Sequence, residues 1–283
     1  MPTAKIIDGN KIAKSIIESV KNKVKSMKEK PGLALVMVGS NPASEVYVNF
    51  KEKDSKEAGF YCERFNLDEK ISEMDLLNLI NGLNNNEKIH GVLVQLPLPK
   101  HIDEKLVTDA ILPHKDVDGF TAVNLGNVLS EKTILAPATA RAVINLIEST
   151  GTKIEGKNAV VVGRSNIVGK PVALMLLEKN ATVTICHSKT KNISEYTKKA
   201  DILVVAVGKV DLITKEMVKE GAVVIDVGIN RVGNKLIGDV DFDSVKEVAG
   251  FITPVPGGVG PMTRAMLMEN TLKAMELSKK LYK

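Results

Sequence analysis

Residues 158–186 read NAVVVGRSNIVGKPVALMLLEKNATVTIC, and this stretch decides the fold of the second half of the chain. The β-branched run 158–163 predicts a buried strand, the apolar spacing of 168–180 predicts an amphipathic helix, and 181–186 predicts another strand. Two successive strands joined by a helix run parallel, because a parallel pair needs a long crossover connection. The stretch therefore predicts one unit of a doubly wound parallel sheet.

The same alternation extends over the whole chain of 283 residues and predicts an α/β protein with two domains. Further strands are expected at 33–39, 61–67, 91–99, 201–208 and 222–228. Further helices are expected at 10–30, 42–59 (with Asn41 as its cap), 72–86, 193–200 and 214–221. We expect one α/β domain at 1–138, completed by a C-terminal helix at 263–283, and a Rossmann-like doubly wound domain at 139–262. The chain is expected to pass from the first domain to the second and to return to the first. This arrangement predicts a ligand cleft between the domains.

Composition excludes several classes of protein. The chain is 44% hydrophobic and 26% charged with a net charge of +5, and its lysines are scattered, so nucleic-acid binding is not expected. Its apolar runs are far shorter than the roughly 18–20 residues that span a bilayer, and its first residues lack a signal-peptide core, so we expect a cytoplasmic protein without membrane contact. Cys62 and Cys186 show neither disulfide nor zinc spacing, so no metal is expected.

The turn after the first quoted strand is a candidate cofactor loop. Gly163 and a helix that starts near Val168 turn backbone N–H groups toward an anion, although an ordinary strand-to-helix turn would look the same. In NAD-binding folds a carboxylate about 20 residues further on binds the ribose 2′-hydroxyl. Here the second strand ends in CHSKT (186–190), which has no carboxylate. Arg164, Ser165 and Ser188 could instead bind a 2′-phosphate, which favours NADP over NAD.

Five polar side chains in the first half are candidates for catalysis or substrate binding. Tyr47 and Lys51 lie at i and i+4 on one helix face, where the alternative is a surface lysine beside a half-buried tyrosine. Gln95 follows an apolar strand, at the edge where open α/β sheets bind ligands, unless its amide caps a loop. Asp116 and Asp118 in KDVDGF suit an Asx-turn as well as a binding site.

The stretch ITPVPGGVGPMT (252–263) is a candidate wall of the site. Its prolines fix the backbone, and its glycines, among them Gly257 and Gly258 after Pro256, let a flat ligand approach closely. A cofactor loop, a Tyr/Lys pair, a strand-end glutamine, an aspartate loop and this wall together suit hydride transfer beside a polar substrate pocket.

Over essentially its whole length the chain resembles the bifunctional methylenetetrahydrofolate dehydrogenase/methenyltetrahydrofolate cyclohydrolases, the FolD family. The segments that carry the resemblance are NPASEVYVNFK, IHGVLVQLPLP, KDVDGF, VVVGRSNIVGKP, CHSKT, VIDVGIN, GDVDF and TPVPGGVGPMT. The resemblance implies NADP-dependent oxidation of 5,10-methylenetetrahydrofolate to the methenyl compound and its hydrolysis to 10-formyltetrahydrofolate. These reactions belong to one-carbon metabolism, which supplies purine and amino-acid synthesis. The resemblance also implies a homodimer.

The resemblance also implies roles for the candidate residues. Lys51 matches the central catalytic lysine, Tyr47 the residue that positions the folate, and Gln95 the residue that tunes the lysine. Asp118 matches the aspartate that binds the pterin ring. The implied cofactor contacts are Gly163, Arg164, Ser165, Ser188 and Ile229. The loop implied beside nicotinamide and folate contains Pro256, Gly257 and Gly258.

The chain departs from the family pattern at two places. The family reads Pro-Cys-Thr-Pro where this chain has PATARA (137–142), with Ala138 and Ala140, and we expect Thr139 to cap the helix that follows. Arg264 stands where an aliphatic residue is usual. The alternatives are a family member that has only the dehydrogenase activity, a shikimate-type NADP dehydrogenase, and a non-catalytic regulator.

Overall fold

The computed structural model describes residues 3–233 and 235–281, which divide into two compact units. Met1–Ala13 and Thr139–Thr263 form a six-stranded unit, and Lys14–Ala138 and Arg264–Lys283 form a three-stranded unit. The domains expected from the sequence were 1–138 with 263–283 and 139–262, whereas this division places the segment up to Ala13 with the six-stranded unit. The first residues lie in the six-stranded unit because β1 (Lys5–Ile6) pairs with its sheet, and a strand of two residues leaves no pattern in a sequence.

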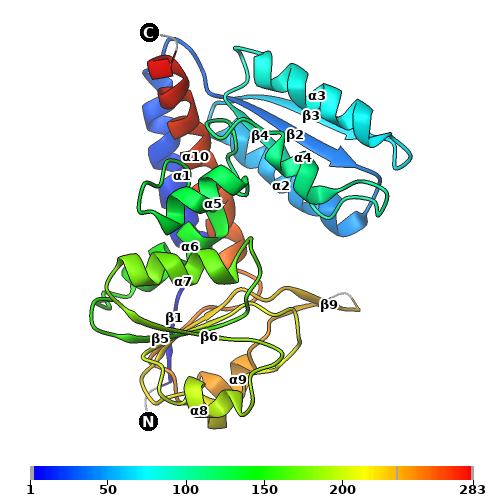
Figure 1. The fold of residues 1–283 in the computed structure, drawn as a ribbon. Coiled ribbons are helices and arrows are strands. Elements are labelled where there is room, and N and C mark those ends of the chain that lie inside the picture. Colours follow the sequence, from blue (N-terminus) through cyan, green and yellow to red (C-terminus); the bar gives the residue numbers. More distant parts are fainter. Residues whose placement is uncertain (1–2, 234, 282–283) are drawn as a thin grey trace. The chain divides into compact units, whose positions relative to one another are not determined.

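The six-stranded unit is built on a parallel sheet with the strand order β1-β11-β8-β7-β5-β6 (Figure 1). Its other strands are β5 (Asn158–Val162), β6 (Thr182–Cys186), β7 (Ile202–Val205), β8 (Val223–Asp226) and β11 (Phe251–Ile252). A separate antiparallel pair consists of β9 (Asn230–Val232) and β10 (Lys235–Ile237). Every neighbouring pair in the main sheet is parallel, so the predicted doubly wound fold is confirmed.

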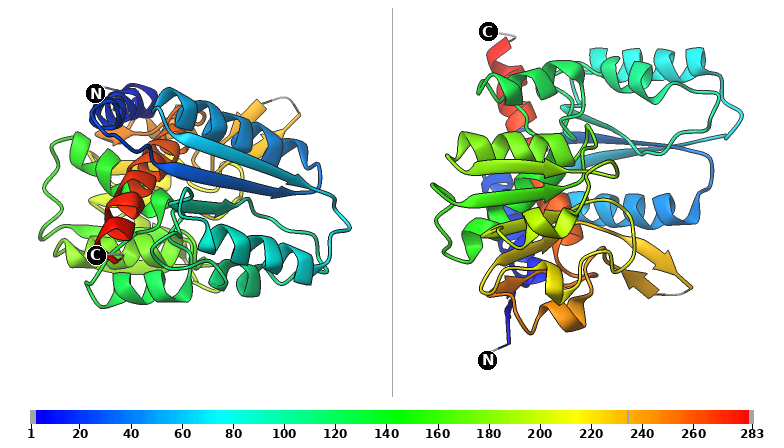
Figure 2. Two further views of the ribbon diagram at one scale, coloured as in Figure 1. Left: turned by 90° about the horizontal axis from the view of Figure 1, so that it is seen from above. Right: turned by 60° about the horizontal axis from the view of Figure 1, so that its bottom comes forward.

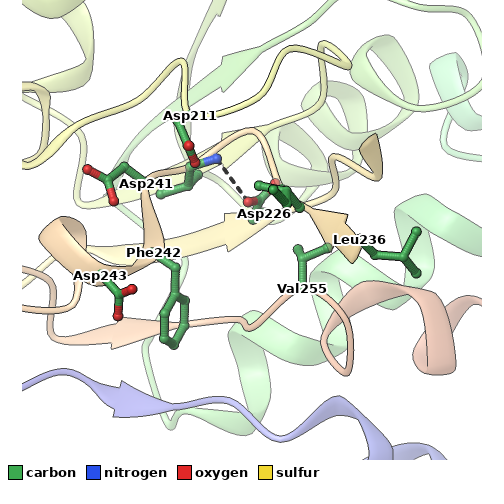
Figure 3. Close-up of a pocket in the computed structure, with 10 residues that line it drawn as sticks. Asp211, Asp226, Leu236, Asp241, Phe242, Asp243 and Val255 are labelled. Atoms are coloured by element: carbon green, nitrogen blue, oxygen red, sulfur yellow. Dashed lines mark hydrogen bonds between the residues drawn. The ribbon is translucent and has the colours of Figure 1, made fainter. Parts of the chain in front are cut away.

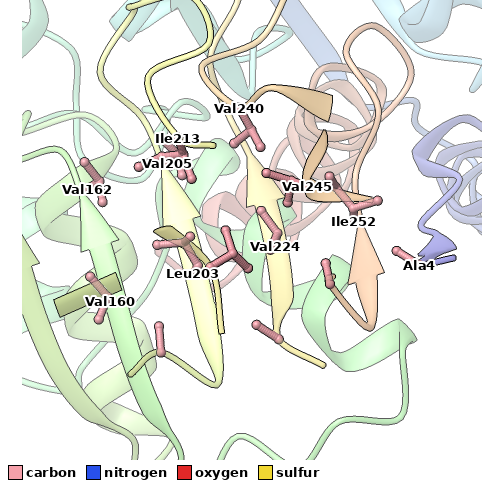
Figure 4. Packing of buried hydrophobic residues seen from close by; sticks show 14 of the residues in the cluster. Ala4, Val160, Val162, Leu203, Val205, Ile213, Val224, Val240, Val245 and Ile252 are labelled. Carbon is pink, nitrogen blue, oxygen red and sulfur yellow. The ribbon is translucent and has the colours of Figure 1, made fainter. Parts of the chain in front are cut away.

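Helices cover both faces of this sheet (Figures 1 and 2). On one face lie α6 (Ala138–Ser149) and α7 (Gly169–Glu178), and on the other lie α8 (Ile193–Thr197), the 3-10 turn η1 (Lys215–Met217) and α9 (Phe242–Val245). Val160, Val162, Leu203 and Val205 form a core with the second group (Figure 4). The residues between them on the same strands are also fully buried, which explains the continuous apolar runs in the sequence.

The three-stranded unit has the parallel order β3-β2-β4. Its strands are β2 (Gly32–Val38), β3 (Tyr61–Leu67) and β4 (Gly91–Val94). Its helices are α2 (Pro42–Glu57), α3 (Glu73–Asn85), α4 (Glu104–Asp109) and α5 (Ala122–Leu129), together with most of α1 (Gly9–Lys25) and α10 (Val259–Leu281). The expected pair of α/β domains is thus confirmed.

Strand β2 is the centre of the three-stranded unit because both of its faces are buried. Leu33, Leu35 and Met37 pack in one core with residues of α1, α2 and α10. Ala34 and Val36 point the other way and pack with residues of α3 and α4. Each fully buried aliphatic side chain of this kind contributes about 1.5–3 kcal/mol to folding. Among residues 3–233 and 235–281, none of the helices has the length and apolarity needed to cross a membrane.

Two expected helix starts have different outcomes. Asn41 caps α2 as predicted, because its side-chain oxygen accepts a hydrogen bond from the Ser44 N–H at 3.2 Å. The prediction that Thr139 caps the next helix is wrong, since α6 already begins at Ala138. Ala138 and Ala140 are almost fully buried there, so small side chains occupy these two positions, where the sequence differs from the pattern that it otherwise resembles.

Candidate active site

The structure brings Lys51 and Gln95 together in the three-stranded unit. Lys51 lies on α2, and its Nζ donates a hydrogen bond to Gln95 Oε1 at 3.0 Å. Gln95 directly follows β4, and its backbone N–H donates to the Val36 carbonyl oxygen at 2.8 Å, which continues the ladder beyond the strand. The Gln95 amide nitrogen donates to the Leu96 carbonyl oxygen at 2.7 Å, so the amide oxygen is turned to the lysine.

Burial and a carboxylate shift the pKa of the Lys51 amine in opposite directions. Loss of water lowers the pKa of Lys51 below the ordinary value of 10.5, and the negative charge of Asp118 opposes this shift. Burial likewise raises the pKa of Asp118, with the Lys51 charge opposing the shift and Asp116 adding to it. Gln95 is neutral and can accept a hydrogen bond from either form of the amine. The arrangement therefore suits an amine that gains and loses a proton during a reaction.

The two aspartates of KDVDGF have different tasks. The buried carboxylate of Asp116 accepts hydrogen bonds from the N–H groups of Gly119 at 2.9 Å and Thr121 at 2.8 Å. It also accepts one from the Asn124 side chain at 2.9 Å. Asp116 therefore holds the turn. Within the part of the chain that the structure describes, no donor bonds to the Asp118 carboxylate, which leaves it available for a ligand.

The loop that carries Asp118 is fixed on both sides. The buried Asn270 of α10 donates from its amide nitrogen to the Val117 carbonyl oxygen at 2.8 Å and to the Ala136 carbonyl oxygen at 3.0 Å. Gly119 has a φ of +75°, and a Cβ there would lie 2.6 Å from the Pro137 nitrogen. Only glycine suits both demands. Sequence reasoning missed Asn270, because it lies in a helix without a motif and far from the loop in the chain.

Helix α2 carries three further residues that bear on this site. Tyr47 is half-buried four positions before Lys51, on the same face of the helix. Asp54 forms an ion pair with Arg264 at 2.6 Å, and the Arg264 guanidinium lies 4.8 Å from the centre of the Phe50 ring. Burial raises the pKa of Asp54 while Arg264 lowers it. The unusual Arg264 thus has an anionic partner within its own unit.

The candidate cofactor loop lies in the six-stranded unit and is built by two close backbone contacts. Gly163 follows β5 with a φ of +135°, and a Cβ there would lie 2.3 Å from the Ala206 carbonyl oxygen. A Cβ on Gly169, at the start of α7, would lie 2.3 Å from the Gly163 carbonyl oxygen. Ser165 accepts hydrogen bonds at its hydroxyl oxygen from the N–H groups of Val168 at 3.2 Å and Gly169 at 3.3 Å. The serine that replaces the middle glycine of the dinucleotide pattern therefore binds the first N–H group of α7 and the N–H group just before it, although the N-cap residue itself is Val168.

The side chains around this loop fit a phosphorylated dinucleotide. Arg164 and Ser165 follow β5, Ser188 follows β6, and these three residues are exposed. Strands β5 and β6 are neighbours in the parallel sheet, so both segments lie at its carboxyl edge. A guanidinium and two hydroxyl groups suit a phosphate, and 186–190 brings no carboxylate to repel one.

The glycine and proline wall packs against the start of α1. The Asn10 N–H donates to the Gly257 carbonyl oxygen at 3.2 Å, and a Cβ on Gly9 would lie 1.9 Å from the Gly258 carbonyl oxygen. Pro256 stays exposed, as does Ile229 beyond β8. The wall packs closely here, because the Gly9 backbone meets the Gly258 backbone with no side chain between them.

A separate cavity of about 240 Å³ opens in the six-stranded unit (Figure 3). It is lined by 236–238 and 240–243 together with Asp211, Asp226 and Val255. None of the sequence-predicted site residues lines it. Among residues 3–233 and 235–281, no three His, Cys, Asp or Glu side chains gather as a metal site.

Comparison with known proteins gives matches over both units. The catalytic domain of tetrahydrofolate dehydrogenase/cyclohydrolase matches residues 7–118, and the NAD(P)-binding domain of the same family matches 137–279. The bifunctional protein FolD of Listeria innocua is 58% identical, and the match covers 95% of this chain and 96% of that protein.

Two solved structures are similar over almost their full length. The bifunctional FolD enzyme of Campylobacter jejuni has a TM-score of 0.94 and 46% identity, with 97% of this chain and 99% of the other covered. The Trypanosoma brucei enzyme, solved with NADP cofactor and inhibitor, has a TM-score of 0.96 and 38% identity, with 99% and 100% covered.

The link between Asp118 and Lys51 predicts the effect of Asp118→Asn. This change removes the negative charge that raises the pKa of Lys51, so the amine should lose its proton at a lower pH than in the wild type. NMR titration of ¹³C-labelled lysine side chains measures this directly. Asp243→Asn, at an exposed site on α9, is the control and should leave Lys51 unchanged. A Lys51 titration that stays in place or moves upward in Asp118→Asn would contradict the coupling.

Proposed function

Because this chain belongs to the tetrahydrofolate dehydrogenase/cyclohydrolase family, we propose that it oxidises 5,10-methylenetetrahydrofolate with NADP⁺ and hydrolyses the resulting 5,10-methenyltetrahydrofolate to 10-formyltetrahydrofolate. The observation that carries the proposal is the Lys51 amine, whose pKa is lowered by burial, hydrogen-bonded to the neutral Gln95 and beside Asp118. This set supports both activities in one chain and a role in one-carbon metabolism.

In the oxidation step, NADP⁺ supplies the acceptor for the hydride that leaves the one-carbon bridge of the folate. Arg164, Ser165 and Ser188 hold the 2′-phosphate, since they offer a cation and two hydroxyl groups at one sheet edge. Gly163 lets the backbone approach the pyrophosphate, and Ile229 contributes an exposed apolar contact. The rigid segment of Pro256, Gly257 and Gly258 presents a flat surface for the nicotinamide and folate rings.

Residues of the three-stranded unit orient the folate. The Asp118 carboxylate is suited to pair with N–H groups of the pterin, because Asp116 and not Asp118 serves the turn. Tyr47 stands one helical turn from Lys51, so its ring can stack on the folate while the amine reaches the one-carbon unit.

In the hydrolysis step, water adds to the methenyl carbon and the carbon–N5 bond breaks, which leaves the formyl group on N10. The neutral Lys51 amine takes one proton from the attacking water, and the ammonium form returns it to the departing N5. The second water proton, left on the new hydroxyl group, is released to solvent as the formyl C=O forms. Gln95 accepts a hydrogen bond from both forms, whereas a carboxylate in its place would favour the charged form.

The residues of the site favour the bifunctional enzyme over the alternative functions. A chain that has only the dehydrogenase activity has no need of the Lys51–Gln95 pair, which is intact here. A shikimate-type dehydrogenase or a non-catalytic regulator would not explain why Tyr47, Lys51, Gln95 and Asp118 occur together.

We also infer a homodimer, as the family resemblance implies. Strand β6 ends the six-stranded sheet, and its exposed Ile185 adds an apolar side chain to this open edge. Leu177 on α7 and Tyr196 on α8, both exposed, precede and follow the strand. Light scattering at micromolar concentration should give twice the mass of one chain, and the mass of a single chain would contradict the dimer.

The role of Lys51 predicts the effect of Lys51→Met on hydrolysis. Loss of a general acid–base group costs about 10²–10⁴-fold in rate. Decay of methenyltetrahydrofolate absorbance should slow accordingly, while NADPH binding, followed by its fluorescence, should stay within twofold of the wild type. Lys53→Met, at an exposed lysine of the same helix, is the matched control. Ring opening near the wild-type rate in Lys51→Met would remove Lys51 from the mechanism.

The proposed phosphate contact predicts the effect of Arg164→Ala on cofactor choice. A hydrogen bond to a charged group contributes about 1.5–3 kcal/mol, so the KM for NADP⁺ should rise roughly 10- to 100-fold. The KM for NAD⁺, which lacks the 2′-phosphate, should change little and provides the internal control. Steady-state kinetics with both cofactors measure the difference, and equal effects on the two KM values would refute the assignment.

A further inference from the structure

Two buried aspartates of the six-stranded unit have no part in the site described so far. Asp226 is 3% exposed at the end of β8, and Asp239 is fully buried just after β10. In the described ranges 3–233 and 235–281, no lysine, arginine or histidine forms an ion pair with either carboxylate. Their negative charges are therefore compensated by N–H groups.

Asp239 accepts hydrogen bonds from three consecutive backbone N–H groups. Its Oδ2 accepts hydrogen bonds from the N–H groups of Val207 at 2.7 Å and Gly208 at 2.9 Å. Its Oδ1 accepts one from the Lys209 N–H at 2.8 Å and one from the Asn230 side chain at 2.9 Å. Four donors thus converge on one carboxylate, which fixes the path of 207–209.

The segment held by Asp239 supports the cofactor loop. It follows β7, the sheet neighbour of β5, and the Ala206 N–H donates to the Val162 carbonyl oxygen at 2.8 Å. The Ala206 carbonyl lies so close to Gly163 that a Cβ on the glycine would come within 2.3 Å of its oxygen. Any shift of 206–209 therefore moves the surface against which the Gly163 turn packs.

Asp226 in turn fixes Asp239. Its Oδ1 accepts from the N–H groups of Asp239 at 3.0 Å and Gly228 at 2.9 Å, and its Oδ2 accepts from Val240 at 3.0 Å (Figure 3). A Cβ on Gly228 would lie 2.2 Å from the Asp239 carboxyl carbon, so the carboxylate fills the space that a side chain would need. Gly228 directly precedes Ile229. The same two carboxylates therefore also fix the backbone that leads to Ile229.

We propose that Asp239 is a positioning residue for cofactor binding: it holds 207–209, the segment directly after Ala206, whose carbonyl packs against Gly163, and it helps to place the backbone that leads to Ile229. It acts through the backbone and does not touch the cofactor. The inference rests on the proposed NADP-dependent function.

A carboxylate is required at this position because all four partners are donors. Asparagine has nearly the same size but offers one acceptor oxygen, and its NH₂ group would face backbone N–H groups. Asp239→Asn should therefore loosen 207–209 without a change in volume. NADPH should bind at least tenfold more weakly, while hydrolysis of methenyltetrahydrofolate, assigned to Lys51, should stay within twofold of the wild-type rate.

The decisive experiment compares Asp239→Asn with Asp241→Ala. Asp241 caps α9 by accepting the Ser244 N–H, so its loss destabilises the same unit without touching 207–209. NADPH dissociation constants are measured by fluorescence, together with the thermal midpoint and the hydrolysis rate of each variant. Support requires weakened NADPH binding in Asp239→Asn alone. Wild-type affinity in Asp239→Asn, or equal weakening in Asp241→Ala, would overturn the proposal.

A milder variant decides the matter if Asp239→Asn does not fold. Asn230→Ala removes one of the four hydrogen bonds to Asp239 and leaves the three backbone bonds in place. It should weaken NADPH binding several-fold at a near-wild-type thermal midpoint, and unchanged affinity would overturn the proposal. A wild-type protein that binds NADPH but does not oxidise methylenetetrahydrofolate would refute the proposed function, while the NADPH affinities would still test Asp239.

Discussion

The candidate site depends on the parallel direction of the strands in the six-stranded and the three-stranded sheet. Parallel strands end at the same edge, and the segments that leave this edge carry the ligand-binding groups of open α/β proteins. In the three-stranded unit Gln95 leaves β4, and in the six-stranded unit Gly163, Ser188 and Ile229 leave β5, β6 and β8. The buried strands thus fix the position at which each following loop begins. Glycines in these loops allow the loop backbones to pack closely.

The chemistry of the three-stranded unit follows from opposing effects on one amine. Burial disfavours the ammonium form of Lys51, and the charge of Asp118 favours it. Because Gln95 is neutral, it holds the amine in place without adding a charge to this balance. Because Asp116 holds the turn, the Asp118 carboxylate remains available for a ligand.

Local pattern predicted most of the fold, since the long strands and helices have clear periodicity. It missed β1 and the β9–β10 pair, which are too short for a period, and it misplaced the start of α6 because Thr139 resembles a cap. Residue spacing alone could not separate Asp116 from Asp118, which only the family resemblance did, and it could not find Asn270 or Asp239. Asn270 and Asp239 act through contacts distant in the chain. The sequence could not identify Asp54 as the partner of Arg264, because the two residues lie on α2 and α10, which are far apart in the chain.

The central claim is that one chain transfers a hydride from the folate one-carbon unit to NADP⁺ and then hydrolyses the product. Mass spectrometry after incubation with NADP⁺ and methylenetetrahydrofolate that carries two deuterium atoms on its bridge tests this most directly. We expect one deuterium in the NADPH and the other in the formyl group of 10-formyltetrahydrofolate, formed faster than without enzyme. NADPH without deuterium, or a reaction that the protein carries no further than the methenyl compound, would contradict it.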